Sequence, residues 1–337
     1  MTRHWRTLLG IALSILLLWF TLRGEDFGEI WGVLSSSSIP LWIACTITAT
    51  AIFPMRARRW QALLAPSHGR LPLGPLWRAT AIGMMVNNVV PARAGELARA
   101  FALTRERPEV RFSGAFASLA VDRLFDGVVV LAMMLLATLD PRFPAESTIF
   151  GASAWSIAAT MSLALGAVFV ALALLAYAPA WCFGVSDRIV GAVAPKLAPK
   201  VRGLLEGFAA GVGVLRQPML ALEVLWWAVL LWATNAFAFY LGFLALGIEA
   251  PLSAAFFVQG LIAIGVAIPS SPGFFGPFEL AGKAGLALYA VSDASAVSWA
   301  IGFHLLSFVP ITVIGAWYFA RLDLRFKDLS GAAKETA

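Results

Sequence analysis

The stretch MMVNNVVPARAGELARAFAL, residues 84–103, decides how this chain is interpreted. It begins as apolar as a membrane helix, reaches Pro91, and then places Arg93, Glu96 and Arg99 close together. Proline removes a backbone hydrogen bond and breaks or kinks a helix. Three charges therefore follow directly on a helix break, in a chain that otherwise carries few charged residues.

The composition is that of an integral membrane protein. Of 337 residues, 60% are hydrophobic and 13% are charged, whereas soluble domains carry roughly 25% charged residues. Several uncharged runs are long enough to cross a hydrocarbon core of ~30 Å. No polar linker divides the chain, so we predict an all-α polytopic membrane protein with a single integral membrane domain over residues 1–337.

The basic residues behind the net charge of +6 are concentrated in alternate segments of the chain, as expected if those segments lie on one side of the membrane. Loops 23–29 and 140–146, and those near Glu249 and Asp293, hold few Lys or Arg residues or none. Because cytoplasmic loops carry the excess of Lys and Arg, the pattern predicts cytoplasmic termini and requires no nucleic-acid partner. The basic residues concentrate in segments 1–6, 56–78, 105–111, 188–216 and 321–334.

Six uncharged or nearly uncharged runs predict six transmembrane helices. Two further apolar pieces do not fit as ordinary crossings. Residues 75–104 lie between two basic segments, and residues 251–291 lie between two loops without Lys or Arg, so each piece enters and leaves on one side. Each has a proline-containing break near its middle and is predicted to be a re-entrant helical hairpin. The six predicted spans are about 7–22, 35–55, 112–139, 147–178, 218–247 and 294–320.

The two halves of the chain have the same order of elements in opposite topology. Each half has a span, a hairpin and a second span, and Pro91, Gly95 and Glu96 in the first break match Pro272, Gly276 and Glu279 in the second. An inverted repeat with interrupted helices is typical of a secondary transporter whose site lies where the breaks meet. The predicted organisation is a first span (1–34), repeat one (35–139) with hairpin 75–104, a connecting span and cytoplasmic amphipathic segment (140–217), repeat two (218–320) with hairpin 251–291, and a cytoplasmic tail (321–337).

The charges after the first break predict an anion site. A charge at membrane depth costs ~2.5–3.5 kcal/mol on insertion scales, so it normally faces a cavity or a partner. A helix that starts after the break would direct its N-terminal amides at an anion. Arg93 and Arg99 suit a phosphate because guanidinium binds its oxygens bidentately, and Asn88 and Glu96 belong to the same cluster. The alternative is an ion-pair cluster that only stabilises the hairpin.

A second cluster lies in SLAVDRLFDGVVVL, where Asp122 and Asp126 share one helical face and Arg123 lies beside them. Arg123 could pair with Glu96 or Glu279, or contact a ligand.

A third cluster lies in IPSSPGFFGPFELAGK, where Ser270 and Ser271 could cap a helix or bind a headgroup. Glu279 could pair with Lys283 four residues on, or take part in transport. His304 could titrate near neutral pH or be a hydrogen-bonded core residue. The candidate proton carriers are Glu96, Asp126, Glu279 and His304.

Three of these stretches resemble the motifs of a known family: NVVPARAGELAR (88–99), DRLFD (122–126) and PSSPGFFGPFE (269–279). They are similar to the flippase-like transmembrane domain of lysylphosphatidylglycerol synthases and its stand-alone relatives, over nearly the whole chain. Asp122 stands where Glu is expected, and Phe274 replaces a usual second Gly, which would narrow the headgroup site. The resemblance implies lipid translocation in a bacterial inner membrane. No soluble domain follows Arg321, so lysyl-lipid synthesis is not implied.

We therefore expect a flippase or scramblase for a phospholipid or a polyprenyl-phosphate-like lipid, with homo-oligomers possible. Arg93, Arg99 and Arg123 would hold the phosphate. No nucleotide-binding motif is present, and the two cysteines lack the spacing of a disulfide or metal site, so no cofactor, metal or catalytic residue is predicted. The alternatives are an intramembrane enzyme that modifies a lipid headgroup and a non-transporting accessory of an envelope-lipid enzyme.

Overall fold

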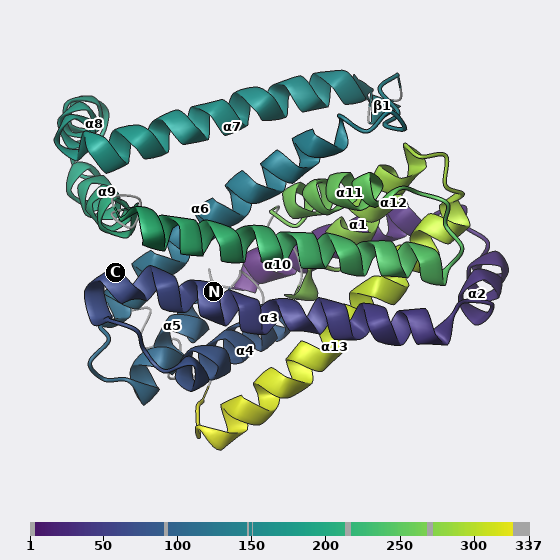
Figure 1. Cartoon of the computed structure of the whole chain (residues 1–337), viewed down its shortest axis with the longest axis horizontal. Helices are drawn as coiled ribbons and strands as arrows, with labels where there is room; N and C mark the ends of the chain where they lie inside the picture. The colour runs from purple at the N-terminus through teal and green to yellow at the C-terminus, as the bar shows by residue number, and fades with distance from the viewer. Residues whose placement is uncertain are drawn as a thin grey trace.

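The computed structural model describes residues 4–90, 94–146, 148–149, 151–212, 217–267 and 272–325. Within these ranges the chain is helical apart from loops and one short strand pair, β1 (Thr148–Ile149) and β2 (Ala152–Ser153) (Figure 1). The prediction of an all-α membrane protein is confirmed at this level. The helices are α1 (His4–Leu22), α2 (Phe27–Ser35), α3 (Ile39–His68), α4 (Leu73–Val89), α5 (Gly95–Glu106), α6 (Phe112–Ala137), α7 (Ala154–Tyr177), α8 (Pro179–Val193), α9 (Ala198–Val212), α10 (Pro218–Ala245), α11 (Leu252–Gly265), the 3₁₀ turn η2 (Pro272–Phe274), α12 (Pro277–Ala287) and α13 (Asp293–Arg321).

Three of the described helices, α3, α10 and α13, are long and apolar enough to cross a membrane. They contain 30, 28 and 29 residues, which at 1.5 Å per residue exceeds a hydrocarbon core of ~30 Å. Large apolar side chains such as Trp31, Leu163 and Met219 point outward. Such a surface suits lipid rather than water as the surrounding solvent.

Helix α3 continues to His68, well beyond the predicted span 35–55. The arginines after residue 55 end the apolar run without ending the helix, because Arg56 and Arg59 are buried inside the protein. Segment 56–78 is therefore not simply a basic cytoplasmic loop. The apolar run and the helix therefore end at different residues.

The N-terminal part contains a second helix that the sequence analysis did not predict. Helix α2 starts because the Asp26 side chain accepts a hydrogen bond from the Gly28 amide at 2.7 Å. Helix α1 packs on α12 and α2 packs on α13, so both cover the second half of the chain. Two helices, α8 and α9, follow α7 within the predicted segment 140–217, and they are separated between Val193 and Ala198.

Both predicted helix breaks are present. Helix α4 ends at Val89 and α5 begins at Gly95, while α11 ends at Gly265 and α12 begins at Pro277. In each pair the two helices are in close contact. A Cβ atom on Gly95 would lie 2.1 Å from the carbonyl oxygen of Gly83, so only glycine allows α4 and α5 to approach this closely.

The packing of one half has its counterpart in the other. Helix α3 lies along α10 (Figure 1). Helix α4 packs on α13 as α11 packs on α6, and α5 packs on α4 and α6 as α12 packs on α11 and α13. The α5–α6 connection and the α8–α9 pair lie at one end of the molecule (left in Figure 1), opposite α2 and β1. The basic segment 105–111 and the described part of the second basic segment, 188–212, thus share an end.

Candidate functional site

A cavity of about 760 Å³ lies between the two halves. The second break contributes to its wall, since η2 packs against α4 and Gly273 and Phe274 line the cavity. Most of the lining is aliphatic or aromatic. The polar side chains on its wall are Asn88, Glu96, Arg123, Asp126, Trp232, Asn235, Gln259, His304 and Ser307.

A buried ionic network joins α3, α5 and α6 beside this cavity. Asp122 and Asp126 project from the same face of α6 toward α3. Arg59 donates from Nε to Asp122 Oδ1 at 2.6 Å and from Nη1 to Asp126 Oδ1 at 2.7 Å. Arg56 Nη1 donates to Asp126 Oδ2 at 3.1 Å, and Arg99 Nη1 donates to Asp122 Oδ2 at 3.2 Å. The Arg59 side chain is 0% exposed and the side chains of its partners Asp122 and Asp126 are 1% and 7% exposed, so these charges are buried.

Sequence reasoning missed Arg56 and Arg59. It identified the two carboxylates on α6 but assigned these arginines to a cytoplasmic segment. A usable signal was present: two membrane-depth carboxylates require cationic partners, and Arg56 and Arg59 are spaced i, i+3 immediately after an apolar helix.

The expected phosphate ligand Arg99 lies behind the cavity wall instead of on it. It is buried, and its guanidinium carbon lies 4.2 Å from the ring centroid of Trp60. Arg99 therefore belongs to the network that supports the cavity.

Among the described residues, this network has more positive than negative groups. Arg56, Arg59, Arg99 and Arg123 face the carboxylates of Glu96 and of the two aspartates on α6. Three buried donors have no hydrogen-bond partner there: Arg56 Nε, Arg59 Nη2 and Arg99 Nε. Buried donors without partners are costly, and an excess cation beside a cavity favours an anion in it.

Arg123 is the arginine of this network that reaches the cavity wall. Its Nε donates to Glu96 Oε1 at 3.0 Å, its Nη2 contacts the same oxygen, and its Nη1 donates to Asp126 Oδ2 at 3.4 Å. The Arg123 side chain remains 42% exposed. Of the partners predicted for Arg123, the structure selects Glu96. Asp126 is held further by Trp232, whose Nε1 donates to Oδ1 at 2.7 Å.

On the opposite side of the cavity, Glu279 and His304 hold the second break together. Glu279 Oε2 accepts from the Gly276 amide at 2.6 Å, and Glu279 Oε1 lies 2.5 Å from His304 Nδ1. His304 Nε2 lies 2.8 Å from the carbonyl oxygen of Gly273. Since a carbonyl oxygen only accepts, Nε2 is the donor in this contact, and the imidazole connects Glu279 to the backbone of the break. The imidazole lies between the rings of Phe275 and Phe278.

The predicted pairing of Glu279 with Lys283 is wrong. The Glu279 side chain turns back to cap the first turn of its own helix, away from the position one turn later. Lys283 instead pairs with Glu25 and, at 3.1 Å, with Asp293.

The structure brings five of the predicted site residues to the cavity region and leaves two behind its wall. Asn88 donates from Nδ2 to Thr312 Oγ1 on α13 at 2.7 Å, which links the first hairpin to the second half. Arg93, Ser270 and Ser271 lie outside the described residues. The cavity-lining predicted residues are Asn88, Glu96, Arg123, Asp126 and His304, and the predicted residues outside the lining are the buried Arg99 and Glu279.

The cavity also has an uncharged polar region that sequence reasoning missed. Asn235 Nδ2 donates to Gln259 Oε1 at 3.1 Å, and the buried Gln259 amide points its Nε2 at the sulfur of Met133 at 3.5 Å. A thioether is a weak acceptor. Both amides occur alone in apolar helices, and that isolation was the available signal.

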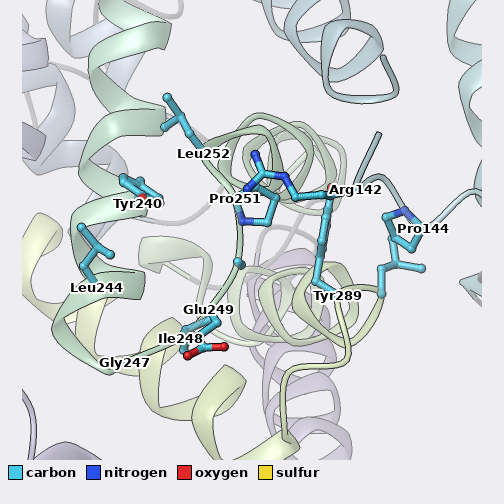
Figure 2. Close-up of a pocket in the computed structure, with 12 residues that line it drawn as sticks. Arg142, Pro144, Tyr240, Leu244, Gly247, Ile248, Glu249, Pro251, Leu252 and Tyr289 are labelled. Carbon is cyan, nitrogen blue, oxygen red and sulfur yellow. The ribbon is translucent and has the colours of Figure 1, made fainter. Parts of the chain in front are cut away.

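A second cavity of about 840 Å³ lies where α10, α11 and the α12–α13 connection meet. Figure 2 shows the Arg142 side chain extending over Pro251, with Glu249 across the opening. Arg142 is paired with Asp140 at 3.1 Å, and its side chain is 70% exposed. Its hydrogen bonds, with one from Ser253, hold the pKa of the Asp140 carboxyl below its usual range. An exposed ion pair of this kind changes the free energy of unfolding little and needs no special role. Buried charges are costly, so the central cavity that they adjoin is the stronger candidate site.

Fold and site together define an α-helical membrane protein with a buried, positively biased ionic network beside a central cavity. The family described as the lysylphosphatidylglycerol synthase TM region matches residues 7–315. The chain belongs to this family, which confirms the resemblance seen in its motifs.

A curated relative is similar over part of the chain. The glycosyltransferase AglD of Haloferax volcanii is 31% identical over 147 residues, which cover 41% of this chain and 23% of the relative. The chain thus spans less than a quarter of that protein's length. No solved structure matches.

Proposed function

We propose that this protein moves a phosphate-bearing lipid between the two leaflets of a membrane, as a flippase or scramblase. The central cavity would take the headgroup while the acyl or prenyl chains stay in the surrounding lipid. The observation that carries the proposal is Arg123, a half-exposed guanidinium on the cavity wall that is backed by a buried network with an excess of positive charge.

The headgroup would meet two chemically different regions. Its phosphate would bind Arg123, since guanidinium binds phosphate oxygens bidentately. Neutral polar groups of the headgroup would face the amides of Asn235 and Gln259, which line the same cavity. The membrane-lipid character of the family supports this assignment.

The layout proposed for transport is six transmembrane helices with two re-entrant hairpins in an inverted repeat, in a bacterial inner membrane with both termini cytoplasmic. The corresponding packing of α3–α6 and α10–α13 supports it. In inverted repeats, alternating access arises when the two halves exchange conformations around a fixed site. The second break, which lines the cavity at Gly273 and Phe274, would change shape in that exchange.

The alternative is an intramembrane enzyme acting on a lipid headgroup, and the name of the AglD relative favours it. The binding of Asp126, a carboxylate on the cavity wall, weighs against it. Asp126 accepts hydrogen bonds from three arginines and Trp232. A general base must reach and accept a substrate proton, which such pairing opposes.

The test is movement of fluorescent phospholipids between leaflets in proteoliposomes. Arg123→Gln should reduce the rate at least tenfold, which corresponds to about 1.4 kcal/mol. The control Arg70→Gln, in an exposed pair with Glu223, should leave it unchanged. If Arg123→Gln folds and moves lipid like the wild type, the site assignment is wrong. Product formed from a labelled sugar donor without lipid movement would favour the enzyme, and neither activity would favour the accessory role.

A further inference from the structure

Glu96 differs from the other carboxylates of the ionic network in how firmly it is held. Asp122 is bound by Arg59 and Arg99, and Asp126 by three arginines and a tryptophan. The Glu96 side chain accepts hydrogen bonds from one side chain among the described residues, Arg123. Both members of this pair line the cavity. Among the described side chains, only Arg123 would have to move to release Glu96, whereas each aspartate would still be bound by another side chain.

Glu96 occupies the edge of Arg123 that a phosphate would use. One edge of the planar guanidinium carries the Nε and Nη2 donors, and both face Glu96 Oε1. The third nitrogen, Nη1, faces Asp126. An edge with two donors binds phosphate and carboxylate oxygens in a bidentate manner. A headgroup phosphate and Glu96 therefore compete for the same two donors.

We propose that Glu96 is an exchangeable internal anion: headgroup binding displaces it from Arg123, and the displaced carboxylate takes up one proton. The inference rests on the proposed function, and it explains why the affinity of that site for a lipid headgroup would depend on pH. Once the phosphate holds Arg123, an ionised Glu96 would lie beside two other negative groups, the phosphate and Asp126, in a largely apolar cavity. A like charge and desolvation both disfavour the charged form of a carboxyl.

The charge balance is consistent with this exchange. A phosphodiester brings one negative charge to the network, and protonation of Glu96 removes one. The net charge beside the cavity is the same before and after binding, so headgroup entry adds no uncompensated charge to a low-dielectric site.

The other ionisable groups near Glu96 are less suited to take the proton. Asp126 keeps Arg56, Arg59 and Trp232 when Arg123 turns to the ligand. His304, across the cavity on α13, is bound on both ring nitrogens. The remaining charged groups on the described helices around α5 are Arg99 and Arg105 on α5 itself, Asp122 on α6, Arg56, Arg58 and Arg59 on α3, and Arg78 on α4, which is bound to Glu106 at the far end of α5.

The test is titration of the purified full-length protein in detergent with dioctanoyl phosphatidylglycerol, whose phosphodiester keeps one negative charge between about pH 5.5 and 8.5. Over the part of this range in which Glu96 is ionised in the free protein and protonated in the complex, the wild-type Kd should rise roughly tenfold per pH unit, the slope of a one-proton linkage. Calorimetry in two buffers of different ionisation enthalpy should show uptake of about one proton. Glu96→Gln should bind at least tenfold more tightly at pH 8 and lose the pH slope. The matched control is Glu223→Gln, whose carboxylate is similarly exposed, 25% against 21%, and also paired with an arginine.

The outcomes separate this inference from the proposed function. If Glu96→Gln keeps the wild-type affinity and slope while Arg123→Gln loses binding, the headgroup binds without displacing Glu96, and only the inference fails. If Arg123→Gln binds like the wild type, the lipid site itself is wrong. If inorganic phosphate binds as tightly as dioctanoyl phosphatidylglycerol, the ligand is a free anion, and the proposal that it is a lipid headgroup is wrong.

A conservative variant keeps the inference testable if Glu96→Gln does not fold. Glu96→Asp shortens the side chain by one methylene but keeps the acid. It should bind lipid more tightly than the wild type, because its hold on Arg123 is weaker, and it should retain the pH slope. A Glu96→Asp protein without that slope would overturn the proposal.

Discussion

Replacing Arg59 by leucine tests whether the buried network stabilises the fold. Arg59 is 0% exposed and supplies the two shortest ion-pair contacts to the aspartates, at 2.6 Å to Asp122 and 2.7 Å to Asp126. Removing one partner of a buried pair costs about 3–5 kcal/mol, because the other charge remains buried without compensation. Asp126 would keep Trp232 and two arginines, but Asp122 would keep only Arg99 at 3.2 Å. We therefore expect a loss of about 3 kcal/mol, the lower end of that range.

The assay is thermal unfolding in mild detergent, followed by the fluorescence of the 13 tryptophans. At about 2 °C per kcal/mol for a chain of this size, Arg59→Leu should lower Tm by roughly 6 °C. Arg70→Leu breaks an exposed pair, with Arg70 61% exposed, and should cost at most about 1 kcal/mol. Adding Asp122→Asn to Arg59→Leu should recover part of this loss of stability, because it removes the buried carboxylate that has only Arg99 left as a partner. Equal Tm values for Arg59→Leu and Arg70→Leu, or no recovery in the double variant, would refute the reasoning.

Three further predictions concern the first break, the second break and the outer loop. Gly95→Ala should lower Tm by several degrees, because the new Cβ would overlap the Gly83 carbonyl and overpacking costs about 1–3 kcal/mol. The control Gly184→Ala should leave Tm unchanged, because a Cβ atom on Gly184 would have no neighbour within 4 Å. Phe274→Gly should leave Tm nearly unchanged, because Phe274 has a left-handed φ of 63° that costs about 1–2 kcal/mol for a residue with a side chain. The same variant should speed the leaflet movement of fluorescent lipid, because the Phe274 side chain lines the cavity. Slower lipid movement would contradict this prediction. Asp140→Asn should be less stable than the wild type at pH 7. Because the pKa of the Asp140 carboxyl is lowered by folding, its contribution is full above about pH 4, its ordinary pKa, and falls as the pH drops further, so the Tm difference should shrink toward about pH 3.

Several features of the fold could be read from local sequence. Pro91 and the prolines around Gly273 predicted both helix breaks, and α4–α5 and α11–α12 have them. Arg123 and Glu96 were predicted as one possible ion pair and are one. In both cases a local signal sufficed: a residue that cannot continue a helix, or a charge at membrane depth that requires a partner.

Other features depended on contacts that sequence spacing does not reveal. The i, i+4 spacing suggested Lys283 as one possible partner of Glu279, but the observed partner is His304, 25 residues away on α13. Helix α3 was ended too early because Arg56 and Arg59 were expected to face water. Whether a charged residue ends a membrane segment depends on what packs against it.

The sequence by itself determined the class of this protein, an α-helical membrane protein with two broken helix pairs. Hydrophobicity accumulates along a run of residues, and a proline acts on its own turn, so both can be evaluated without the fold. Only the tertiary structure decided which charges share the buried network. Arg59 and Asp122 are 63 residues apart in the chain, and they pair because α3 packs against α6. The energy of a buried charge depends on distances of a few ångströms between helices, which the order of the residues does not specify.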